Sequence, residues 1–105
     1  RWSLCHEAFD ALRYLRKEGE LDTVEDVLLN AEPTPAVASE LRKTLSAKAK
    51  LAKEEKDWES VVHYLESYVG YADKWRQHCL EEVSQGPPPL TDNDKKLLDQ
   101  ARENA

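Results

Sequence analysis

The fold is decided by residues 57–83, DWESVVHYLESYVGYADKWRQHCLEEV, in which apolar side chains recur at a regular spacing. Successive intervals of 4, 3, 4, 3 and 4 residues form the heptad pattern of a long helix with one buried seam. Tyr64 and Tyr71 lie beside this seam, so the apolar face is broad and aromatic. Such breadth is typical of the central helix of a bundle rather than a two-stranded coiled coil. The seam residues are Val61, Leu65, Tyr68, Ala72, Trp75 and Cys79.

Further helices are predicted on either side of this stretch. Gly19 can adopt the left-handed conformation that ends a helix, so it closes the first one. Thr34 is a good N-cap, followed by Pro35 at the first helical position, where its missing N–H is not needed. Pro87–Pro89 separate the central helix from a last one, which Thr91 caps. These helices cover residues 3–17, 21–30, 35–56 and 92–103.

The expected fold is all-α, a single up-and-down helical bundle of four main helices plus a short one. The chain has 105 residues, 40% of them hydrophobic and only three of them glycine, which is the composition of one helical globular domain. Asp57 resembles an N-cap, so a turn is predicted between the third helix and the central one. We therefore expect residues 1–105 to form one domain.

The charge balance bears on the kinds of partner. The formal net charge of −6 opposes nucleic-acid binding, so no nucleic-acid partner is expected. Arg42–Lys53 is mildly basic, but Glu40, Glu54 and Glu55 lie among or beside its lysines, which favours a solvated surface. No apolar run approaches the ~20 residues that span a bilayer, so no membrane span is predicted.

The two cysteines, Cys5 and Cys79, both fall on predicted apolar helix faces, and two interpretations are open. They are either buried thiols that pack as small hydrophobic residues, or one disulfide worth roughly 4 kcal/mol in the chain-entropy model. An even count in a small domain favours the disulfide if the chain is extracellular.

No catalytic or metal-binding constellation is expected. His6 and His78 are each adjacent to a cysteine, but adjacent helical residues diverge by about 100°, whereas helical zinc ligands sit three or four residues apart. The acidic residues between Asp22 and Asn30 lack the glycine and closing glutamate of a calcium loop. The three scattered glycines cannot form a phosphate-binding loop. We therefore predict no enzyme activity, no metal and no cofactor.

The aromatic residues are the candidate binding residues. Tyr and Trp anchor protein interfaces well, but the same residues are also the largest ones available for the core, which is the favoured interpretation for most of them. Trp58 and Tyr71 lie at the flanks of the apolar stripe and are the best candidates for partial exposure. A helix face bearing both, on the side of Arg42–Lys53, is the predicted docking surface.

The layout resembles the FIMAH domain, a small helical module appended to extracellular proteins of Gram-positive bacteria. The resemblance covers most of the chain, although residues 22–35 read as an insertion and the two cysteines are a further departure. It implies an accessory interaction or spacer module, with no active site and no individual binding residue to transfer. It rests on Glu18-Gly19-Glu20-Leu21, on the helix pair Ala36–Trp75 with Leu41, Leu45, Ala52, Asp57, Val61, Leu65, Tyr68 and Val69, and on Leu90–Ala101.

The predicted function is that of a non-catalytic, extracellular accessory or protein-interaction helical module with a protein partner. One alternative is a structural subunit or processed fragment of a larger assembly, because the chain starts at Arg1 and contains no Met. The other is a helical carrier that holds a small apolar ligand among the tyrosines, which requires a cavity of several hundred Å³, on the order of 300 or more.

Overall fold

The aromatic stretch forms a long helix, α4 (Trp58–His78), in the computed structural model, which describes residues 3–78 and 86–105. Its seam is buried as predicted, since Val61, Leu65, Tyr68, Ala72 and Trp75 are each at most 5% exposed. Cys79, the sixth seam position, and the rest of the predicted helix to residue 83 lie outside the described residues.

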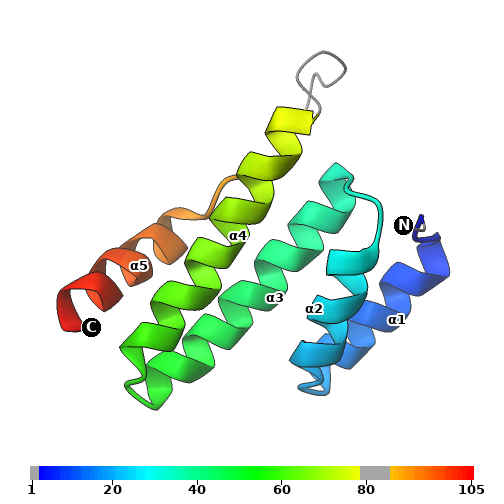
Figure 1. The fold of residues 1–105 in the computed structure, drawn as a ribbon. Coiled ribbons are helices and arrows are strands. Elements are labelled where there is room, and N and C mark those ends of the chain that lie inside the picture. Colours follow the sequence, from blue (N-terminus) through cyan, green and yellow to red (C-terminus); the bar gives the residue numbers. More distant parts are fainter. Residues whose placement is uncertain (1–2, 79–85) are drawn as a thin grey trace.

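The all-α prediction is confirmed. The other helices are α1 (His6–Lys17), α2 (Leu21–Asn30), α3 (Pro35–Glu54) and α5 (Asp92–Asn104), and the described residues contain no strand. Figure 1 shows α1 to α4 running alternately down and up, with α5 packed obliquely along α4. Each helix packs mainly against its neighbours in sequence, which places α3 between α2 and α4.

The predicted helix boundaries follow from local backbone chemistry. The Thr34 hydroxyl accepts a hydrogen bond from the Val37 N–H at 3.1 Å, and the Thr91 hydroxyl accepts one from the Asp94 N–H at 3.1 Å. These two caps satisfy N–H groups that have no partner within their own helix. The chain turns between α3 and α4, where Lys56 has a φ of 58° and Asp57 accepts from the Ser60 N–H at 3.3 Å. The turn before α4 is thus confirmed.

The first helix begins later than predicted, at His6 instead of Ser3. Cys5 is its N-cap residue, with extended backbone angles, and its side chain is exposed. The prediction that Cys5 lies on an apolar helix face is therefore wrong, because a residue in extended conformation does not share the helical repeat that orients the apolar side chains of α1.

Small residues of α3 face the large residues of α4 in the core. Ala49 and Ala52 are buried on α3, and Tyr68 and Leu65 are buried on α4. Small side chains on one helix allow a close approach of a neighbouring helix that carries large ones. The core also includes Leu12, Val24, Leu28, Ala31, Val37, Leu41, Leu45, Leu90, Leu97, Leu98 and Ala101.

A buried ion cluster connects α1 to α3. Glu40 is only 3% exposed, and its carboxylate lies 2.8 Å from Arg16 Nη1 and 3.4 Å from Arg13 Nε. Burial disfavours the charged carboxylate, but the Arg16 hydrogen bond and the charges of Arg16, Lys43 and Arg13 outweigh it and lower the pKa of Glu40. The cluster orients α1 against α3 through the Glu40 carboxylate, which stays ionised at neutral pH.

Two glycines provide a paired test of where the helices end, because one lies at a helix end and the other within a helix. Gly19 has a φ of 87°, which strains any residue with a Cβ, whereas Gly70 lies within α4 and a Cβ there meets nothing within 4 Å. We expect Gly19→Ala to lower the free energy of unfolding by about 1 kcal/mol and Gly70→Ala to raise it by about 0.5 kcal/mol. Urea denaturation of both variants measures the difference. Equal shifts would contradict the assignment of Gly19 to a left-handed cap.

Candidate functional site

A groove of about 270 Å³ lies over the C-terminal half of α3, between α2 and α4. Its floor comes from α3, its first wall from the α1–α2 turn and the start of α2, and its second wall from the start of α4. We call it the α3 groove. It is lined by Gly19, Leu21, Asp22, Lys48, Leu51, Ala52, Glu55, Asp57, Ser60 and Tyr64.

Lys48 is the central charged residue of the α3 groove. Its side chain is 10% exposed, and its ammonium group forms ion pairs with Asp22 and Glu25 of α2. The same ammonium lies 5.3 Å from the centre of the Tyr64 ring, which is cation–π distance. Lys48 therefore connects three helices through charge, since its partners come from α2 and α4.

These contacts decide the protonation of Lys48. Burial alone disfavours the ammonium form, but the hydrogen bonds to Asp22 and Glu25 and their charges outweigh burial and raise the pKa of Lys48. A protonated amine has no free lone pair, so it cannot attack a carbonyl carbon. The arrangement suits charge-based binding and positioning, and it does not activate Lys48 as a nucleophile.

The described residues contain neither a metal-binding cluster nor a membrane-spanning helix. Within residues 3–78 and 86–105, no three His, Cys, Asp or Glu side chains gather so as to hold a metal ion. No helix in the described part of the chain has both the length and the apolar character needed to cross a bilayer.

Comparison of the chain with family models, with curated proteins and with solved structures found no match.

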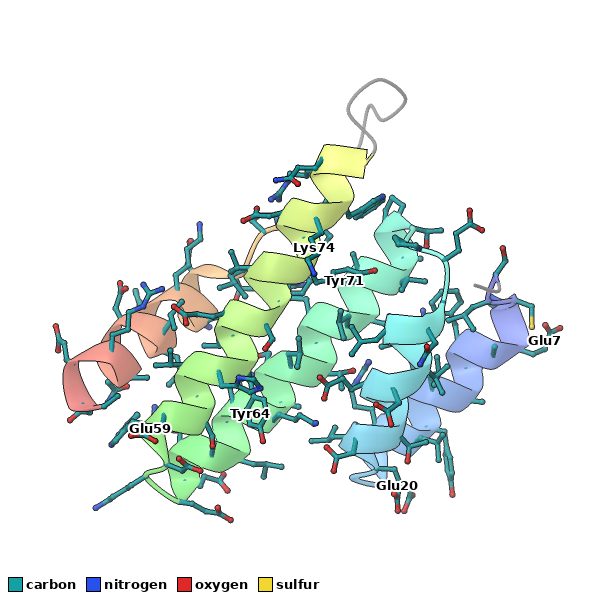
Figure 2. The ribbon with its side chains drawn as sticks, in the orientation of Figure 1. Glu7, Glu20, Glu59, Tyr64, Tyr71 and Lys74 are labelled. Carbon is teal, nitrogen blue, oxygen red and sulfur yellow. The ribbon has the colours of Figure 1, made fainter. Side chains whose placement is uncertain are left out.

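The structure does not bring the two predicted binding residues into one surface. Trp58 and Tyr71 are both half-buried and pack against the core. They are thirteen residues apart on one helix, which separates their directions by about 140°. Figure 2 shows Tyr71 and Tyr64 one above the other on the side of α4 that borders α3. Trp58 instead shares its side of α4 with Val69, which lines a pocket with Pro88 and Pro89.

Of the two cysteines in the predicted disulfide, only Cys5 lies among the described residues. Cys5 is exposed and forms no disulfide with any described residue. Cys79 lies outside the described residues, so a bridge between Cys5 and Cys79 stays a prediction.

The sequence does not single out Lys48 as a site residue, because the mixed charges around Arg42–Lys53 favour a solvated surface. A signal was present, since Leu41, Leu45, Lys48 and Ala52 follow intervals of 4, 3 and 4 residues. A lysine on such a stripe points toward a neighbouring helix and needs a carboxylate partner. The position of Lys48 on this stripe is therefore the signal in the sequence that indicates its burial.

Proposed function

We propose that this chain is a non-catalytic helical module that binds a protein partner through the α3 groove. The observation that carries the proposal is Leu51, a large apolar residue that is 52% exposed while lining a groove. The Tyr64 ring lies in the same groove, and the carboxylates of Asp22, Glu55 and Asp57 line it too. A groove that combines an exposed apolar side chain and an aromatic ring with charged side chains has the mixed composition of protein interfaces.

We further propose that the module is an extracellular accessory part of a larger protein. The resemblance of the helix layout to the FIMAH domain supports this class, because that family serves as an accessory module. The predicted Cys5–Cys79 disulfide fits the same compartment. Intact-mass measurement with and without a reductant tests the bridge, and free thiols under non-reducing conditions would oppose an extracellular location.

The apolar-ligand carrier is less well supported. Tyr68 is fully buried, and the pocket beside it holds about 170 Å³, below the roughly 300 Å³ at which small-molecule sites begin. The α3 groove is larger, but charged residues line it. These volumes and linings favour contact with a protein surface over enclosure of an apolar molecule.

Site-specific photo-crosslinking tests the proposal. A benzoylphenylalanine placed at position 51 is expected to form a discrete, saturable adduct with a partner protein in medium and extracts of the producing organism. Excess unlabelled chain should compete for this adduct, and the Leu51→Arg variant should compete at least about tenfold less well, because a central interface residue contributes on the order of 2 kcal/mol.

Leu29 provides the matched control. It is 43% exposed on α2 but does not line the α3 groove. The Leu29→Arg variant should compete as well as the unmodified chain, and a crosslinker at position 29 should not yield the same adduct. Equal competition by both variants would refute the groove as the binding surface. Adducts formed only between copies of the chain would favour the structural-subunit alternative.

A further inference from the structure

A second groove, of about 270 Å³, lies between α3 and α5. Lys50 and Lys53 of α3 line one side, and Lys96 of α5 lines the other, so we call it the lysine groove. It shares no lining residue with the α3 groove. Its remaining lining residues are Asn93, Asp94, Leu97 and Gln100.

The three lysines of this groove form no ion pair with a residue that the structure describes, whereas the nearby Lys48 forms two. The one carboxylate in the lining, Asp94, is 3% exposed and accepts a hydrogen bond from the Ser46 hydroxyl at 2.7 Å. With three lysines against one aspartate in its lining, the groove is locally positive in a chain whose net charge is −6.

The extent of the groove indicates the shape of a suitable anion. Asn93 and Gln100 are seven residues apart on α5, which is about 10 Å along a helix, or about three residues of an extended peptide. Their amide side chains can donate to and accept from a peptide backbone. Charge spread along this length favours several carboxylates carried on one chain over a single compact anion.

We propose that the lysine groove docks an acidic peptide segment of a partner protein. This rests on the proposed function only in that the partner is a protein, because the two grooves have separate residues. Carboxylates that enter the groove relieve the mutual repulsion of the three ammonium groups and form charge-assisted hydrogen bonds with them. The amides of Asn93 and Gln100 position the peptide backbone.

Titration of the chain with a capped hexaglutamate peptide at low salt tests the proposal. We expect saturable binding, with amide chemical-shift changes centred on the lysine groove, and no binding of capped hexaglutamine. The triple variant Lys50→Gln, Lys53→Gln, Lys96→Gln should bind hexaglutamate at least about tenfold more weakly, because it loses three charge pairs with the peptide. Thermal denaturation verifies that the variant is folded.

A second triple variant, Lys17→Gln, Lys56→Gln, Lys74→Gln, is the matched control. It changes the net charge equally, through exposed lysines that do not line the groove. It should keep its affinity for hexaglutamate. Because this titration contains no partner of the α3 groove, its outcome is independent of the crosslinking test. Equal weakening in both triple variants would overturn the proposal, since it would show diffuse charge attraction. Binding of pyrophosphate without binding of hexaglutamate would overturn it in favour of a small-anion site.

Discussion

Replacing Tyr68 by alanine is expected to lower the free energy of unfolding by about 4 kcal/mol, the typical cost of removing a large aromatic side chain from a core. Tyr68 of α4 is 1% exposed and belongs to the hydrophobic core. Its hydroxyl donates a hydrogen bond to the Pro88 carbonyl, which attaches the segment before α5 to α4. The variant therefore loses both packing and the connection to α5. Urea denaturation followed by circular dichroism measures the loss.

Two variants separate these contributions. Tyr68→Phe keeps the ring and removes only the hydroxyl, so we expect a loss of about 1 kcal/mol. Tyr14→Ala makes the tyrosine-to-alanine change at a side chain that is 63% exposed, and it should shift stability by no more than about 0.5 kcal/mol. A similar loss for Tyr14→Ala and Tyr68→Ala would contradict the central place of Tyr68 in the core.

The buried phenol also predicts a response to alkali. Burial raises the pKa of Tyr68 from 10.0 to about 12, with the charge of Tyr71 adding to the rise and those of Arg42 and Arg76 opposing it. The group binds its proton more tightly in the folded chain, so its contribution is complete below pH 10 and is lost as the pH rises through about 12. Tyr68→Phe should be less sensitive than the unmodified chain across this window.

The second large effect concerns the buried carboxylate on α3. Glu40→Gln is expected to lower the free energy of unfolding by about 2 kcal/mol at neutral pH. The change leaves Arg16 without its counter-charge, whereas the half-exposed Arg13 keeps its pair with Asp10, so the cost stays below that of breaking a fully buried pair. Glu66→Gln is the matched control, because Glu66 and Arg102 pair at 2.8 Å with both side chains about half exposed. It should change stability by less than about 0.5 kcal/mol.

The same cluster predicts acid sensitivity. The pKa of Glu40 in the folded chain lies below the ordinary value of 4.5, so its contribution is present above pH 4.5 and is lost as the pH falls through the folded-state pKa. The difference in stability between the unmodified chain and Glu40→Gln should therefore shrink below pH 4.5. Urea denaturation between neutral and acid pH measures it. A difference that stays constant with pH would show that Glu40 acts through packing and not through charge.

The local elements of the fold could be predicted because their signals lie within a few residues of one another. The seam of α4, the caps at Thr34 and Thr91 and the turn at Asp57 depend on helical repeat and on side chain to backbone hydrogen bonds over three residues. The start of α1 is harder to predict from the sequence, because Cys5 forms no side-chain capping hydrogen bond that would mark the first residue of the helix. Helix ends without such a bond carry little local information.

The sequence by itself determined that this protein is a set of α-helices, which apolar residues of α4 form the buried seam, and where most of the helices begin and end, because hydrophobic repeat and capping act within one segment. Only the tertiary structure decided how charges from different helices meet. Lys48 forms ion pairs with Asp22 and Glu25 of α2, whereas Lys50 and Lys53, close by on the same helix, line a groove with Lys96 and form no ion pair with a described residue. The physical reason is that the energy of a charge depends on what lies within a few ångströms of it in space, which the spacing along a single helix does not specify.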